Sequence, residues 1–128
     1  MMWVELVTVL AVLQCLVFSF LVGGAREKFK IEAPATSGNE IFERRHRVHM
    51  NTIEQLIVFL PCLWIAAHYS NPARIAAIGA VFLVGRVFYY TGYVKDPKKR
   101  GPGFGISFLS VASLLIYALV DVIRALAH

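Results

Sequence analysis

A polar stripe interrupts a largely apolar part of this 128-residue chain. Arg47, Asn51 and Glu54 lie at positions i, i+4 and i+7, which a helix places on one face. This face therefore carries a cation, an amide and an anion side by side. Arginine binds carboxylates through paired hydrogen bonds, and a carboxylate can hold an amine. The stripe predicts a site for a small polar molecule that bears several charges.

A second polar stripe follows downstream, where Arg86, Tyr89 or Tyr90, and Tyr93 fall within two turns of a predicted helix. Ionisable residues at membrane depth are costly and usually face a bundle interior, a partner or a cavity. Two interpretations stay open at this point. The stripes form a binding site, or Glu54 makes a structural ion pair with an arginine of either stripe. The tyrosines are also typical of rings at the lipid headgroup level.

The composition places both stripes in a membrane protein. Hydrophobic residues make up 58% of the chain, charged residues only 16%, and the mean hydropathy is +0.63. A bilayer core of about 30 Å needs roughly 20 apolar residues in a helix. Four apolar blocks fit that length, the second only if Asn51, Glu54 and Gln55 are included. We expect an all-α, integral membrane four-helix bundle in one domain, 1–128, with helices over about 2–25, 41–69, 73–95 and 103–126.

Basic residues predict how the chain crosses the membrane. Ten of them fall after the first block and after the third: Arg26, Lys28, Lys30, Arg44, Arg45, Arg47, Lys95, Lys98, Lys99 and Arg100. Only Arg74 and Arg124 fall on the opposite side. This bias predicts that both termini face away from the cytosol, in a bacterial inner membrane or the endoplasmic reticulum. Because positive charges follow the first block, we expect a retained helix rather than a signal peptide.

The sequence offers little for metal, disulfide or nucleotide chemistry. His46 and His49 are three residues apart, but no third ligand is evident, so we expect no metal site. Cys15 and Cys62 each lie within an apolar block and offer no disulfide framework. No phosphate loop, nucleophile elbow or HExxH pattern occurs. From composition alone we expect the run Lys98–Arg100 to contact anionic membrane lipid, and we expect no nucleic-acid partner.

The segment from Phe42 to Glu54 resembles the signature of the MAPEG family, membrane-associated proteins in eicosanoid and glutathione metabolism. Its pattern is E-R-x-x-R-x-x-x-N-x-x-E. The segment from Gly85 to Tyr93 is similar to the third-helix pattern of that family, R-x-x-Y-x-x-x-Y. The basic run that ends at Arg100 resembles the one before the fourth helix in microsomal glutathione transferases. The resemblance covers nearly the whole chain and is closest to the branch of those transferases and leukotriene C synthase.

The resemblance implies a homotrimer that binds glutathione between neighbouring subunits, near the cytosolic side. It implies that Arg100 activates the thiol, since a guanidinium beside sulfur favours the nucleophilic thiolate. The other implied site residues hold glutathione or line its pocket: Arg26, Arg47, His49, Asn51, Glu54, Tyr89 and Tyr93. Of these, Arg26 is implied to come from a neighbouring subunit. Glutathione has two carboxylates and one amine, which suits several arginines and one carboxylate.

The function that the resemblance implies is a glutathione S-transferase of detoxification, with glutathione as co-substrate. Its thiolate attacks lipophilic electrophiles from the bilayer, and peroxidase activity on lipid hydroperoxides is a further expectation. Glu27 and Gln55 stand where leukotriene C synthase has arginine and tyrosine, which disfavours a leukotriene-specific activity. Two alternatives stay open: a glutathione-dependent isomerase of the prostaglandin type, and a non-enzymatic lipid-binding membrane protein. Arg100 argues against the second alternative, because the non-enzymatic branch lacks that arginine.

Overall fold

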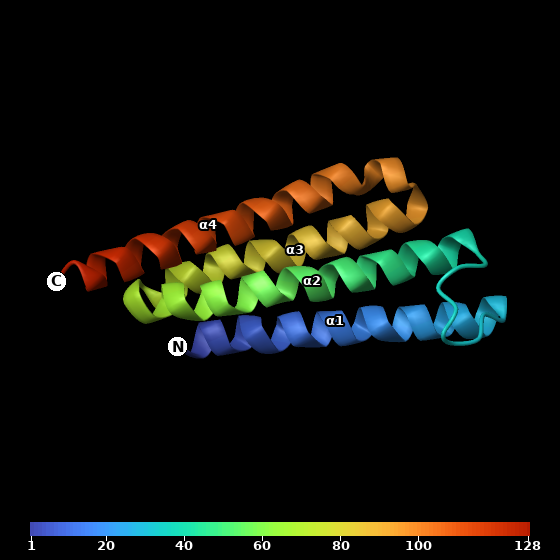
Figure 1. The fold of residues 1–128 in the computed structure, drawn as a ribbon, viewed down its shortest axis with the longest axis horizontal. Coiled ribbons are helices and arrows are strands. Elements are labelled where there is room, and N and C mark those ends of the chain that lie inside the picture. The colour runs from blue at the N-terminus through green and yellow to red at the C-terminus, as the bar shows by residue number, and fades with distance from the viewer.

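The computed structural model describes all 128 residues. Four long helices run alongside one another (Figure 1): α1 (Met2–Phe29), α2 (Glu40–Tyr69), α3 (Pro72–Lys95) and α4 (Gly101–Leu126), with the short 3-10 helix η1 (Pro97–Arg100) before α4. Consecutive helices point in opposite directions. Both chain termini lie at one end of the bundle, and the α1–α2 connection and η1 lie at the other, which we call the η1 end (Figure 1).

Each of the four helices is long and apolar enough to cross a membrane, which confirms the predicted all-helical bundle of membrane-span-like segments. In the most apolar window of α1, only 22% of the residues are buried inside the chain. Large apolar side chains such as Phe20 and Ile57 are 69% and 71% exposed. A surface of this kind suits lipid tails or another apolar partner rather than water.

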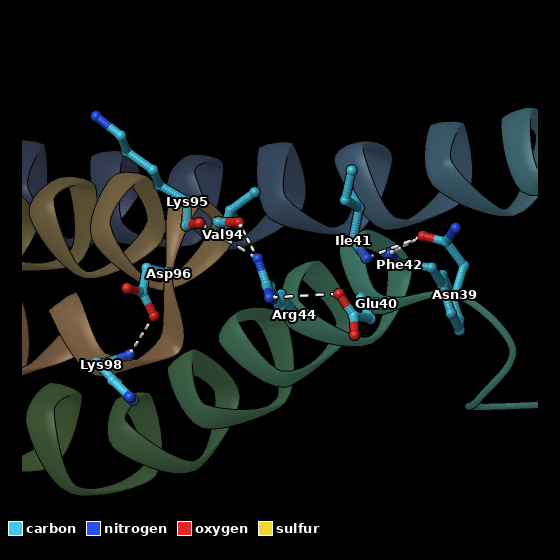
Figure 2. Close-up of polar contacts among 9 residues, drawn as sticks. All are labelled: Asn39, Glu40, Ile41, Phe42, Arg44, Val94, Lys95, Asp96 and Lys98. Atoms are coloured by element: carbon cyan, nitrogen blue, oxygen red, sulfur yellow. Dashed lines mark hydrogen bonds and ion pairs between the residues drawn. The ribbon is translucent and has the colours of Figure 1, made fainter.

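Asparagine side chains mark where two of the helices begin. Asn39 accepts hydrogen bonds from the backbone nitrogens of Ile41 and Phe42, at 2.8 and 3.2 Å, and so caps α2 (Figure 2). Asn71 caps α3 by accepting a hydrogen bond from the backbone nitrogen of Ala73 at 2.9 Å. Both caps satisfy amide groups that the first turn of a helix leaves without a partner.

The first helix runs past its expected end near residue 25 and stops at Phe29. The charged residues that follow the apolar block are good helix formers, so the helix continues beyond the lipid-facing segment. Lys30 then adopts a left-handed conformation, with φ 56° and ψ 46°. The backbone nitrogen of Ile31 donates to the carbonyl oxygen of Arg26 at 2.9 Å, which completes a common type of helix ending.

The main apolar core lies toward the end that holds the termini. Phe59 on α2 and Phe82 on α3 stack at its centre, with 4.1 Å between ring centroids. The buried members come from all four helices: Val4, Val7, Ala11, Phe59, Cys62, Leu63, Ala66, Ala67, Ile75, Ala76, Phe82, Val111, Leu114 and Ala118. Van der Waals packing among these side chains holds the four helices together. The two polar stripes lie nearer the η1 end than this core does, since they precede Phe59 on α2 and follow Phe82 on α3.

Small residues bring α3 and α4 close together near the η1 end. A Cβ atom on Gly85 would lie 2.5 Å from the backbone nitrogen of Ser107. A Cβ atom on Gly103 would collide with the backbone nitrogen of Tyr89. Glycine at these two positions lets the helix backbones touch, as small residues do in membrane helix pairs. Residues on facing turns of α3 and α4 are thereby held within hydrogen-bonding distance.

Arg44 ties the start of α2 to the end of α3 (Figure 2). Its Nη1 donates to the carbonyl oxygens of Val94 and Lys95, at 3.0 and 3.3 Å. These carbonyls belong to the last turn of α3, where a helix leaves them without partners. The carboxylate of Asp96 then accepts a hydrogen bond from the backbone nitrogen of Lys98 at 3.0 Å, which starts η1 (Figure 2). These contacts set where η1, and with it Arg100, begins.

Candidate functional site

A cavity of about 440 Å³ opens between α2, α3 and the start of α4. Seven residues line it: Arg47, Asn51, Tyr89, Tyr93, Arg100, Gly101 and Phe104. The first five of these are residues that the sequence predicts for the site. The two polar stripes and the basic run therefore meet at one hollow near the η1 end. Their part in ligand binding stays a prediction.

Helical spacing explains why these side chains converge. Arg47 and Asn51 are one turn apart on α2, and Tyr89 and Tyr93 are one turn apart on α3. The rings of the two tyrosines lie 5.6 Å apart, in a tilted arrangement. Tyr89 is only 3% exposed, since it packs with Phe18 and Val48 in a small apolar cluster, and Gly103 lies directly against its backbone. The cavity therefore has a rigid aromatic wall on its α3 side.

Arg100 reaches the cavity from η1, just before α4 begins. Its Nη1 donates to the carbonyl oxygen of Pro97 at 2.9 Å, and the residue as a whole is exposed. No carboxylate pairs with it, since the two ion pairs of the chain involve Arg44 and Arg47. A guanidinium has five N–H donors. Arg100 thus keeps donors available for an anionic group in the cavity.

Arg47 and Glu54 form an ion pair with 3.5 Å between Nη1 and Oε1. Their side chains are 52% and 57% exposed. Exposed ion pairs contribute little to stability, so this one is easily exchanged for contacts with a ligand. Glu54 does not line the cavity itself, and Arg86 makes no ion pair with it. Of the two structural pairings considered for Glu54, the structure has the one with Arg47.

Arg86 lies beneath the cavity and is completely buried. Its Nη1 donates to Oδ1 of Asn51 and its Nη2 donates to Oγ of Ser107, both at 2.6 Å. Its Cζ also lies 4.3 Å from the centroid of the Tyr89 ring, which is a cation–π distance. A single arginine on α3 thereby joins α2 and α4 below the lining residues.

Arg26 and His49 lie away from this cavity within one chain. Nη1 of Arg26 donates to the carbonyl oxygen of Ala35 at 2.7 Å, and its guanidinium lies 4.7 Å from the Phe42 ring centroid. Arg26 lines a separate hollow of about 530 Å³ at the end of α1, together with Gly23, Glu27, Lys30, Ile31 and Glu32. His49 is half-buried and lines neither hollow. A single chain therefore brings five of the eight predicted site residues to one cavity. A sixth, Glu54, lies beside it in an ion pair with Arg47.

Sequence reasoning placed Arg86 in the second polar stripe, but the family resemblance implied no ligand role for it, and Ser107 was missed. Ser107 follows Gly103 by four residues, which puts both on the face of α4 that touches α3. This small-residue spacing is the signal that points to a helix contact at Ser107. Gly101 and Phe104 also line the cavity, and they were missed because their positions depend on how η1 directs α4.

Comparisons with known proteins show the family to which the chain belongs. The model of the MAPEG family matches residues 4–120. An uncharacterised protein of Synechocystis is 45% identical over 123 residues, which cover 96% of this chain and 90% of that protein. Microsomal glutathione S-transferase 2 of Bos taurus is 34% identical, with coverage of 92% and 81%. Leukotriene C4 synthase of Bos taurus is 32% identical, with coverage of 95% and 79%. Together with the four membrane-span-like helices, these matches identify the chain as a multi-pass integral membrane protein of the MAPEG family.

Proposed function

We propose that this protein is a membrane-bound glutathione S-transferase that conjugates the thiolate of glutathione to lipophilic electrophiles. The observation that carries the proposal is the cavity in which Arg47, Asn51, Tyr89, Tyr93 and Arg100 converge. Support at the level of the family comes from relatives that are named as a glutathione S-transferase and a leukotriene C4 synthase. Glutathione-related membrane chemistry is thus the function that the chain shares with its relatives.

The charges of the cavity suit a tripeptide with two carboxylates, an amine and a thiol. Arg47 and Arg100 offer guanidinium groups, which pair with carboxylates in a planar, bidentate way. Glu54 sits 3.5 Å from Arg47, so its carboxylate is placed beside the cavity to hold the amine. The hydroxyls of Tyr89 and Tyr93 add donors on the opposite wall.

Arg100 is the residue that we assign to the chemical step. A free thiol has a pKa near 8.5, so most of it is protonated at pH 7. The guanidinium of Arg100 stabilises the thiolate, and the thiol proton passes to water. The thiolate sulfur then forms a bond to the electrophilic carbon while the leaving group departs with its electron pair. With a lipid hydroperoxide, the thiolate sulfur bonds to the terminal oxygen as the O–O bond breaks, which gives glutathione sulfenic acid and a lipid alkoxide that takes a proton from water to become the alcohol. A second glutathione then completes the reduction and yields glutathione disulfide and water.

We further propose a homotrimer in which Arg26 of one subunit reaches the cavity of its neighbour. Within one chain Arg26 lines a different hollow from Arg47 and Arg100. The bundle also leaves large apolar side chains exposed along α1, such as Val9 and Leu13 at 63% and 51%. Neighbouring subunits and lipid would cover this surface, and a lipophilic substrate would enter between subunits from the bilayer. We expect both termini on the non-cytosolic side, because the basic connections share the opposite end.

The test is conjugation of glutathione to an electrophilic aryl halide by the purified protein in detergent. We expect the wild type to be active, Arg100→Ala to lose most activity and thiolate absorbance, and Lys98→Ala to behave like the wild type. Lys98 is the matched control because it lies on the same 3-10 helix but does not line the cavity. An inactive wild type that still binds glutathione would indicate a non-enzymatic membrane protein. Full activity in Arg100→Ala would overturn the proposed chemical step.

A further inference from the structure

Arg86 is the only charged residue in the buried core of the chain, with 0% exposure. No carboxylate neutralises it, because neither ion pair of the chain includes it. Its two terminal nitrogens donate to Asn51 and Ser107, and its Nε has no acceptor. An unpaired buried cation is costly to fold around. A role beyond holding helices together would explain why an arginine occupies this position.

The hydrogen bond from Arg86 fixes how Asn51 presents its amide. A guanidinium can only donate hydrogen bonds, so the amide oxygen of Asn51 must face Arg86. The amide nitrogen of Asn51 has no partner within the chain, yet it is not among the sealed, unpaired polar atoms. Asn51 also lines the cavity. The group that Asn51 offers to a ligand is therefore an N–H donor.

The buried charge of Arg86 favours the same kind of ligand atom. Arg86 does not line the cavity, but its positive charge lies directly behind Asn51. Charges in a poorly hydrated interior act more strongly than charges in water. An electronegative atom of the ligand is thus stabilised both by the amide N–H group and by the cation behind it.

From this geometry we infer that Arg86 is a positioning residue, held by Ser107, which turns Asn51 so that its amide donates a hydrogen bond to an acceptor atom of bound glutathione. The inference rests on the proposed function, since it names how one part of that site recognises its ligand. Ser107 takes part in this positioning because Gly85 and Gly103 let α4 approach α3 closely enough for the Ser107 hydroxyl to accept a hydrogen bond from Arg86. Three helices therefore fix the direction of a single amide group.

Asn51→Asp is the decisive variant, because aspartate keeps the size and the oxygen that accepts from Arg86. Its second oxygen can only accept, so it repels an acceptor atom of the ligand. We expect the Kd for glutathione, measured by calorimetry in detergent, to rise at least about tenfold. The thermal midpoint without glutathione should not fall, since the new carboxylate pairs with Arg86. If Asn51 served folding alone, Asn51→Asp would not raise the Kd for glutathione while leaving the thermal midpoint unchanged. Asn71→Asp is the control, because aspartate caps a helix as well as asparagine does.

Ser107→Ala is the second variant, since it frees one side of Arg86 without touching a cavity-lining residue. We expect glutathione binding to weaken about threefold, as one supporting hydrogen bond is lost. Ser113→Ala is its control, because the Ser113 hydroxyl donates only to its own helix, at Leu109.

If the wild type binds glutathione and Asn51→Asp binds it equally well, the inference is wrong and the proposed function stands. If Ser107→Ala binds like Ser113→Ala, Ser107 has no part in it. If the wild type does not bind glutathione, both proposals are overturned together.

Discussion

Nη1 of Arg44, near the start of α2, donates a hydrogen bond to the carbonyl oxygen of Val94, near the end of α3, at 3.0 Å. The same nitrogen reaches the carbonyl of Lys95 at 3.3 Å. The arginine thus satisfies the end of one helix from the beginning of another, directly before the segment that carries Arg100 (Figure 2). The position of the proposed catalytic arginine depends on this link between α2 and α3.

Arg44→Ala should lower both the stability and the activity of the protein. A lost hydrogen bond from a charged donor costs about 1.5–3 kcal/mol, which shows as a lower thermal midpoint in detergent. Turnover should fall several-fold because η1 becomes less well placed. The control is Lys95→Ala, which removes an exposed cation from the same helix end but keeps the backbone carbonyl. Unchanged turnover in Arg44→Ala would show that η1 holds its position without this link.

Gly103→Ala should destabilise the bundle, whereas Gly105→Ala should not. A methyl group at residue 103 collides with the backbone of Tyr89, so α3 and α4 must move apart. Overpacking of this kind costs about 1–3 kcal/mol. At residue 105 a Cβ atom meets nothing within 4 Å, and alanine is a better helix former than glycine by about 1 kcal/mol. Thermal midpoints of the two variants should therefore shift in opposite directions, and a shared direction would contradict this account of the helix contact.

Glu54→Gln should weaken glutathione binding while leaving the fold intact. The pair of Glu54 with Arg47 is about half exposed, so its loss should change the free energy of unfolding by less than about 1 kcal/mol. Binding should weaken about fivefold or more, because the ligand amine loses its carboxylate partner. Glu5→Gln, near the opposite end of the bundle, serves as control. A large loss of stability with unchanged binding would support a structural ion pair instead.

Mixed oligomers can test whether Arg26 acts on a neighbouring subunit. Arg26→Ala and Arg100→Ala should each be nearly inactive when prepared alone. When they are co-expressed in equal amounts, a site formed in trans is intact where an Arg26→Ala subunit supplies Arg100 and the neighbour that supplies Arg26 is an Arg100→Ala subunit. About a quarter of the sites should then recover in a random cyclic assembly. No recovery would mean that both arginines act within the same chain or that subunits do not share the site. Subunit mass in detergent tests the trimer separately.

The parts of the structure that follow from local geometry could be predicted from the sequence. The lengths of the apolar blocks gave the four helices, because a bilayer requires a fixed number of residues per span. Spacing by one helical turn placed Arg47 with Asn51, and Tyr89 with Tyr93. These two pairs do face the same cavity, because the faces of α2 and α3 that carry them are turned toward each other.

The parts that depend on how helices contact one another could not be predicted. The burial of Arg86 and its link to Ser107 require a close approach of α3 and α4, which two glycines allow. No local pattern gives the register of that contact. The placement of Arg26 in a separate hollow likewise depends on how α1 ends and on which side it packs. Spacing along a helix identifies a shared face but not the neighbour that this face meets.

The wall of the cavity formed by α4 has a consequence for engineering. Gly101 and Phe104 line it without any polar tie to α2 or α3, and Phe104 is 39% exposed. Among aromatic side chains, its ring lies near Tyr89 and Phe108, at centroid distances of 6.3 and 6.1 Å. The polar lining residues come from α2, α3 and η1, whereas α4 contributes only Gly101 and the apolar ring of Phe104. For the proposed transferase activity, residue 104 is the position at which a library of side chains could change the choice of electrophile while the bundle keeps its architecture.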